Sequence, residues 1–304
     1  MKILFFILTL FVGVNLMANE LPDIRSEWNF GNTKQSRDNF EKLIEKYSVH
    51  EEYILELKTQ IARTLGLESR FDEAHKLLDK IKQSLKKEHK TATARYFIER
   101  GRVFNSDNKK EEAAKEFFKA FEASKEINSE HLIVDSAHML AIAVPEFKDQ
   151  KKWTEIAIDE ASKAKDSKVK DWKGSLLNNW GWSLFDQKQY QEAMQVFKDA
   201  LAFRETKNNA EAIIIARWSI ARTHRALNEI DKAIEIQISL IREWERIGKK
   251  DGYVYEELGE LYLVKKDDKN RKKYFKMAYD ELLKDKWFAK NEKKRLERFK
   301  SLSE

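Results

Sequence analysis

Residues 176–201 contain two short amphipathic stretches, separated by a polar turn at residues 186–189. Within each stretch, apolar or small residues recur three, four and seven positions apart, which is the spacing of one face of an α-helix. Gly181 lies on the first of these faces and Ala193 lies on the second. Side chains this small let two helix backbones approach closely, so the pattern predicts a packed pair of helices.

The same paired pattern recurs along most of the chain. The pairs align on the small residue of the second helix, a position that is filled in turn by Ala74, Ala113, Ala157, Ala193, Ala233 and Arg271. The steps between these positions are 39, 44, 36, 40 and 38 residues. Pro145 lies in the longer turn of the third pair, where it should end the first helix. Because arginine is much larger than alanine, we expect the two helices of the sixth pair to splay.

This pattern resembles the tetratricopeptide repeat, in which a large apolar residue precedes Gly, an aromatic residue precedes x-x-Ala, and Phe and Ala follow. Residues 176–201 carry the resemblance through Trp180, Gly181, Tyr190, Ala193, Phe197 and Ala200. The steps exceed the family's usual length of about 34 residues, as in its peptide-sensing bacterial members and some signalling scaffolds. The resemblance implies an all-α fold, a right-handed superhelical solenoid of antiparallel helix pairs.

The chain divides into four predicted parts. We expect a signal peptide in residues 1–18, N-terminal cap helices in 19–54, about six tetratricopeptide-like hairpins in 55–285 and a C-terminal capping helix in 286–304. Residues 286–304 have a narrow apolar stripe among many Lys and Arg, which suits a cap because the last repeat would otherwise expose its stacking surface. The alternative is a basic helix that lies on an anionic membrane.

The N-terminus has the three features of a secretory signal. Lys2 precedes an apolar run from Ile3 to Val14, and the small residue Ala18 follows shortly after it. The alternative is an uncleaved membrane anchor, but a membrane-spanning helix needs about 20 apolar residues, and Gly13 and Asn15 interrupt this run. We therefore predict an exported protein, periplasmic or secreted, whose mature chain begins near Asn19.

Composition narrows the possible classes of protein. Nine Gly and two Pro in 304 residues fit helices with short polar turns better than sheets with many tight turns. The absence of Cys excludes disulfides, Cys-ligated zinc and thiol catalysis. The net charge of +6 is modest for a chain in which 36% of the residues are charged. It does not demand a nucleic-acid partner, which calls for a concentrated basic face.

Motifs for catalysis are missing from the sequence. None of the six His lies in an H-E-x-x-H motif, and neither a Gly-rich phosphate loop nor a G-x-S-x-G elbow is present. We therefore predict no catalytic residue, no metal ligand and no cofactor, and conclude that the chain is not an enzyme. The alternative is an enzyme whose site is assembled from distant repeats.

The resemblance also implies a binding groove lined by the first helix of each repeat. Carried over residue by residue, the groove positions are Glu99, Arg102, His138, Asn178, Asn179, Trp182, Phe185, Trp218, Arg222 and Arg225. Asn offers a donor and an acceptor to a peptide backbone, Trp offers a rigid apolar face, and Arg can pair with a carboxylate. These residues predict a scaffold that binds a protein or peptide partner in its concave groove.

Two other interpretations remain open. The Trp residues could pack between helices, and Arg222 and Arg225 could pair with acidic residues of a neighbouring repeat. A nucleic-acid adaptor would use Arg217, Arg222, Arg225 and the basic C-terminal residues, but the predicted export and the near balance of charges argue against it.

Overall fold

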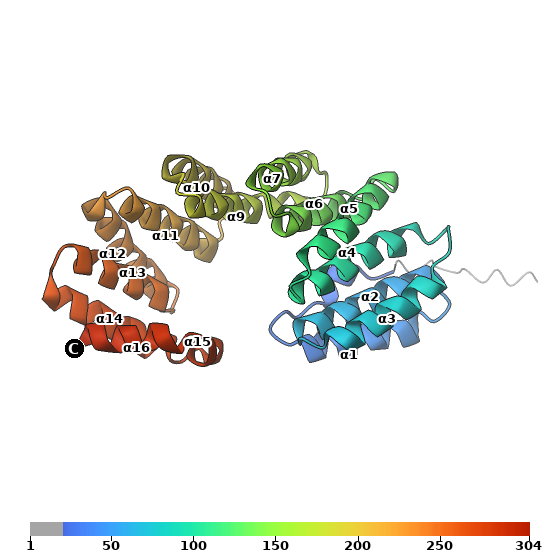
Figure 1. Cartoon of the computed structure of the whole chain (residues 1–304), viewed down its shortest axis with the longest axis horizontal. Coiled ribbons are helices and arrows are strands. Elements are labelled where there is room, and N and C mark those ends of the chain that lie inside the picture. Colours follow the sequence, from blue (N-terminus) through green and yellow to red (C-terminus); the bar gives the residue numbers. More distant parts are fainter. Residues whose placement is uncertain (1–20) are drawn as a thin grey trace, which may run out of the picture. The chain divides into compact units, whose positions relative to one another are not determined.

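The computed structural model describes residues 21–304, and the predicted signal peptide lies outside them. The described chain is all-helical. Its elements are η1 (Ile24–Glu27), α1 (Thr33–Lys46), α2 (Glu51–Leu67), α3 (Phe71–Ser84), α4 (Lys90–Ser106), α5 (Lys110–Glu126), α6 (Glu130–Ala143), α7 (Phe147–Lys163), α8 (Ser167–Lys170), α9 (Trp172–Asp186), α10 (Tyr190–Glu205), α11 (Ala210–Ala226), α12 (Ile230–Arg246), α13 (Gly252–Val264), α14 (Asp268–Leu282), α15 (Lys286–Asn291) and α16 (Lys293–Ser303). Figure 1 shows consecutive helices running as antiparallel pairs, so the predicted all-α solenoid of helix pairs is confirmed.

The described chain forms two compact units, residues 21–113 and 114–304, which we call the N-terminal and C-terminal units. In the N-terminal unit, α2 packs against α1, α3 and α4. The apolar core between α2, α3 and α4 is built around Leu55, Ala62, Leu78, Ile81 and Tyr96. A second cluster, with Phe40 and Leu57 at its centre, joins η1 and α1 to α2.

Non-glycine residues with positive φ follow most of the first helices and two of the second. They are Ser69, Asn108, Asn128, Lys188, Asn208, Asn228 and Lys266, with φ between 52° and 61°. This left-handed conformation reverses the chain within a few residues. The short polar turns predicted between helices are formed in this way.

In the C-terminal unit the pairs are α6 with α7, α9 with α10, α11 with α12, and α13 with α14. The ring of a buried Phe fills the space beside a Gly of the facing helix, Phe197 beside Gly181 and Phe275 beside Gly259. A Cβ added at Gly181 would lie 2.4 Å from Phe197. The spacing of small residues therefore predicted the close approach of the helices correctly.

The sixth pair does not splay as predicted. A Cβ at Gly252 would lie 2.4 Å from Leu282, and one at Gly259 would lie 2.9 Å from Phe275, so α13 and α14 are closely packed along their lengths. Arg271 is accommodated because its side chain, 15% exposed, extends to an ion pair with Asp268 at 3.2 Å. A long apolar stem with a charged end can lie along a helix without separating the backbones.

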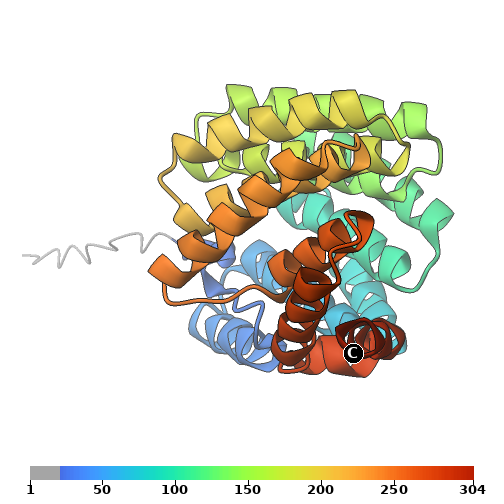
Figure 2. The same cartoon turned by 90° about the vertical axis from the view of Figure 1, so that its left-hand side faces the viewer.

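The C-terminal residues form two helices, α15 and α16, which meet at Glu292. In Figure 2 these red helices lie next to the orange pair α13 and α14. The rings of Phe299 and Phe275 stack at 5.8 Å, and Phe288, Leu296 and Phe299 are buried in the same cluster as α13 and α14. The apolar stripe predicted for residues 286–304 thus covers the end of the last pair.

Candidate functional site

The first helices of the C-terminal unit bring several predicted groove residues together. Trp182 of α9 and Trp218 of α11 have ring centroids 5.7 Å apart, and Phe185 lies 5.1 Å from Trp182. We call these three residues the aromatic face. Trp182 also contacts the buried ring of Phe197 at 5.0 Å. All three members are partly buried, so they pack between helices and still present surface to the solvent.

Arg222 extends the aromatic face along α11. Its guanidinium carbon lies 5.8 Å from the ring centroid of Phe185 and 5.8 Å from that of Trp218. At this distance a guanidinium is attracted by the negative faces of aromatic rings. The contact joins α9 to α11 and places a positive charge beside the exposed parts of Phe185 and Trp218.

The carboxylate of Glu257 pairs with two of the three arginines that were predicted to line the groove, Arg222 and Arg225. Arg222 Nη1 donates to Glu257 Oε2 at 2.9 Å, and Arg225 Nε donates to Glu257 Oε1 at 2.5 Å. The Glu257 side chain is 1% exposed. Burial by itself would lower the pKa of the Arg225 guanidinium, but the hydrogen bond and charge of Glu257 outweigh it and raise that pKa. Pairing with a neighbouring repeat is thus the interpretation that the structure supports for Arg222 and Arg225.

Two more carboxylates of α13 hold the C-terminal helix. Arg295 Nε donates to Glu256 Oε1 at 2.8 Å, and Arg298 Nη2 donates to Glu260 Oε2 at 3.1 Å. Burial raises the pKa of the Glu256 carboxyl, although its bond to Arg295 acts in the opposite direction. These pairs direct Arg295 and Arg298 of α16 toward α13, so these two basic residues help to pack the C-terminal helix.

The two predicted asparagines differ in their surroundings. Asn179 is exposed on α9, while Asn178 is partly buried. In the described chain, the buried side-chain oxygen of Asn178 has no hydrogen-bond partner. A buried acceptor without a partner costs about 1–3 kcal/mol. A ligand N–H that reached this amide after a side-chain rotation would recover that cost.

His138 is placed in a contact between helices. Its ring meets Trp172 edge-on at 6.2 Å, and the ring of His131 meets the same Trp at 5.5 Å. Trp172 begins α9, whereas both histidines lie on α6. His138 therefore helps to pack α6 against α9.

Glu99 and Arg102 belong to the N-terminal unit and form a local network there. Arg102 Nη1 donates to Glu99 Oε1 at 2.6 Å, and Gln60 Nε2 donates to the same oxygen at 3.3 Å. Glu99 is 2% exposed. Its assignment as a groove residue is corrected, because a carboxylate that is buried between α2 and α4 is not available to a partner. The sequence rule missed this, since it places residues on a helix face but does not give the rotation of that helix.

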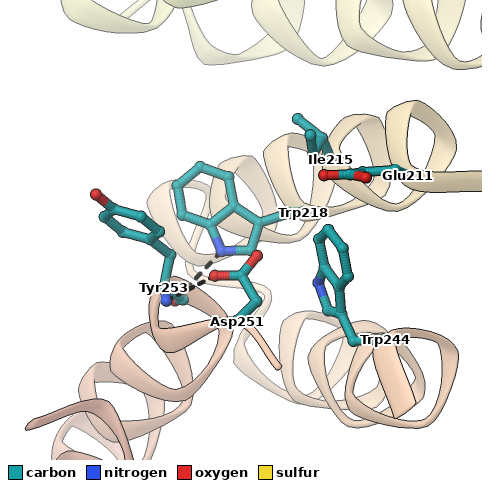
Figure 3. Close-up of a pocket in the computed structure, with 6 residues that line it drawn as sticks. All are labelled: Glu211, Ile215, Trp218, Trp244, Asp251 and Tyr253. Carbon is teal, nitrogen blue, oxygen red and sulfur yellow. Dashed lines mark hydrogen bonds between the residues drawn. The ribbon is translucent and has the colours of Figure 1, made fainter. Parts of the chain in front are cut away.

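One cavity next to the aromatic face was not predicted from the sequence. It has a volume of about 500 Å³ and is lined by Glu211, Ile215, Trp218, Trp244, Asp251 and Tyr253. Figure 3 shows Trp218 beside Tyr253, with its indole Nε1 donating to the Tyr253 carbonyl oxygen at 3.3 Å. The lining residues come from α11, α12 and α13, so no local spacing could have revealed them.

Asp251 lines this cavity and is the N-cap residue of α13. Its Oδ1 accepts from the backbone N–H of Tyr253 at 2.8 Å. Burial raises the pKa of the Asp251 carboxyl, and hydrogen bonds from the amides of Tyr253 and Val254 and from the Trp244 side chain oppose this only in part. Glu211, by contrast, is neutralised by Lys249, whose Nζ lies 2.6 Å from Glu211 Oε2. Within residues 21–304, Asp251 makes no ion pair.

The described residues give no support for metal binding or membrane crossing. Among residues 21–304, His, Asp and Glu side chains nowhere gather in a group of three that could hold a metal ion. No helix in this range is both long and apolar enough to cross a membrane.

Comparisons with known proteins agree with the fold. A family model of the tetratricopeptide repeat matches residues 174–211, which comprise most of α9, all of α10 and the start of α11. A comparison with curated proteins finds none that matches this sequence.

Solved structures resemble most of the chain at low identity. The apo form of RapI has a TM-score of 0.67 at 13% identity, over 86% of this chain and 74% of that one. An ATPase from Pyrococcus horikoshii with a tetratricopeptide repeat sensor has a TM-score of 0.67 at 14% identity. The match covers 83% of this chain and 38% of that one. Aspartyl phosphate phosphatase F from Bacillus subtilis has a TM-score of 0.57 at 18% identity. The match covers 91% of this chain and 76% of that one. Such identities establish the fold alone. Residues 174–211 thus match the tetratricopeptide-repeat family, and the helical fold of most of the chain is similar to that of these solved structures.

Proposed function

We propose that the C-terminal unit is a non-catalytic scaffold that binds an extended peptide or protein segment along its aromatic face. The observation that carries the proposal is the partly exposed cluster of Trp182, Phe185 and Trp218 on two neighbouring helices. Large rigid aromatic side chains are the usual anchors of protein recognition. The contact of Trp182 with Phe197 and the contacts of the three rings with each other fix them before binding, which reduces the ordering that a partner has to impose.

The polar groups beside the aromatic face suit a peptide backbone. Asn178 and Asn179 of α9 each carry amide donors and an acceptor, and a peptide presents both N–H and C=O groups. Arg222 keeps a third of its side chain exposed even while it is paired with Glu257. The sequence predicted that a ligand carboxylate would pair with free arginines. In the structure it would instead meet Arg222, Arg225 and Glu257, which together carry one net positive charge. Backbone recognition by the amides is therefore the main polar contribution in this proposal.

A double variant of the two asparagines tests the proposal. In Asn178→Ala/Asn179→Ala, we expect binding of the partner to weaken about tenfold to thirtyfold, because up to two hydrogen bonds are lost. The variant should unfold at the same temperature as the wild type or slightly above it, since an unpaired buried acceptor is removed. The partner is first captured from the native host with the wild-type protein, identified by mass spectrometry, and then titrated calorimetrically.

The matched control is Gln191→Ala/Gln195→Ala, which removes two exposed amides from α10 of the same helix pair. This control should bind like the wild type. If the asparagine variant keeps its helicity and binds the partner as tightly as the wild type, Asn178 and Asn179 do not contact the partner.

We also propose that the mature protein is exported, on the strength of the sequence of residues 1–18. The intact mass of the protein recovered from the envelope or medium of its host should correspond to a chain that begins near Asn19. Leu10→Arg, which interrupts the apolar run, should leave the full-length chain in the cytoplasm. A wild-type chain that retains Met1 and stays in the cytoplasm would contradict export.

A further inference from the structure

We propose that the cavity beside Trp218 receives a basic side chain, lysine or arginine, from the bound peptide. The inference rests on the proposed function, because the cavity shares Trp218 with the aromatic face. It adds a preference for one kind of side chain in the partner. A volume of about 500 Å³ accommodates a long side chain together with part of its backbone.

The walls of the cavity suit a side chain with an apolar stem and a cationic end. Trp218, Trp244 and Tyr253 line it from three helices, and Ile215 completes the apolar surface. Aromatic faces attract ammonium and guanidinium groups, and tryptophan does so most strongly. The chain itself uses this attraction nearby, since the guanidinium of Arg295 lies 5.7 Å from the ring centroid of Tyr253.

The charges around the cavity leave one carboxylate for an incoming cation. Arg222 is paired with Glu257, Arg295 with Glu256, and Lys249 with Glu211. Asp251 is the remaining charged group of the lining, and it has no ion pair within the described chain. Its Oδ1 caps α13 by accepting from Tyr253 N–H, and the carboxyl also interacts with the Trp244 side chain, so it is held in the lining with a charge that no cation of the described chain neutralises. A partly buried carboxylate between aromatic rings favours a cation over an apolar or acidic group.

Glu211 is the second carboxylate of the cavity lining, and its ion pair with Lys249 decides whether it can also attract a cationic ligand. The ammonium of Lys249 lies on Glu211 from the loop between α12 and α13, with both side chains about half exposed. An exposed pair of this kind is weak and exchanges with other cations. Removing Lys249 would therefore free Glu211 and raise the negative charge of the cavity.

The test uses blocked tripeptides as probes on the whole purified protein. The probes are acetyl-Ala-Lys-Ala-amide, acetyl-Ala-Arg-Ala-amide, and matched peptides with norleucine or glutamate at the centre. Binding is followed by NMR shifts of the tryptophan indole N–H groups. We expect the Lys or Arg probe to bind about tenfold more tightly than the norleucine probe, because a charge-assisted hydrogen bond is added.

Asp251→Asn is the decisive variant. Asparagine is as good an N-cap as aspartate, so α13 should remain folded while the charge is removed. This variant should abolish the tenfold preference for the basic probes and leave the norleucine probe unaffected. Lys249→Met should strengthen binding of the basic probes. The matched control is Asp267→Asn, which removes a charge from the N-cap of α14 outside the cavity and should change nothing.

The outcomes separate this inference from the proposed function. Equal binding of the norleucine and basic probes, or an Asp251→Asn variant that keeps the preference, would overturn the cationic pocket. If the probes behave as expected but the asparagine variant binds the partner like the wild type, the pocket stands and the proposed amide contacts fail.

Discussion

Replacing Glu257 with glutamine is expected to lower the free energy of unfolding by about 2–3 kcal/mol. The Glu257 carboxylate is 1% exposed and accepts hydrogen bonds from both Arg222 and Arg225. Glutamine keeps the shape of the side chain but loses its charge, so two neighbouring guanidinium groups would remain without compensation. The loss is smaller than the 3–5 kcal/mol of a fully buried pair because both arginines retain contact with water.

Urea denaturation followed by far-UV circular dichroism measures this effect directly. The control is Glu260→Gln on the same helix, since Glu260 pairs with the exposed Arg298. An exposed ion pair contributes about 0–1 kcal/mol, so the control should differ little from the wild type. If both variants unfold at the wild-type midpoint, the pairs do not hold α11 and α13 together.

Replacing Gly181 with alanine is the second change with a large expected effect. An ideal Cβ at this position lies 2.4 Å from Cε1 and 2.6 Å from Cδ1 of the fully buried Phe197. Overpacking of a closely packed core costs about 1–3 kcal/mol, and this outweighs the gain of about 1 kcal/mol from replacing glycine within a helix. We therefore expect a net destabilisation of up to about 2 kcal/mol.

The effect should extend to the candidate site. Phe197 contacts Trp182 at 5.0 Å, so a shift of the Phe ring moves one member of the aromatic face. The near-ultraviolet circular dichroism of tryptophan should change together with the melting temperature. Gly174→Ala, on the same helix, is the control because its Cβ would meet the partly buried Phe203 at 3.2 Å, a contact that a small movement relieves. A Gly181→Ala variant as stable as this control would contradict the close approach of α9 and α10.

The candidate site was predicted only in part. The family resemblance pointed to Trp182, Phe185 and Trp218 as groove residues, and the structure brings these three together. It also pointed to Glu99, which is buried. The resemblance assigns positions on a helix face, whereas exposure depends on how each helix is rotated against its neighbours. The cavity was missed because its six lining residues come from three helices.

The sequence by itself determined the helix pairs of this protein. Spacings of three, four and seven residues, with small residues such as Gly181 and Ala193 at the contacts, are local features, and each pair closes over about thirty residues of chain. The tertiary structure alone decided what happens between pairs. Glu257 lies 32 and 35 residues from the two arginines that it binds, and Arg271 fits without separating its helices. Such contacts depend on the rotation and register of one pair against the next, which a pattern within a single pair does not specify.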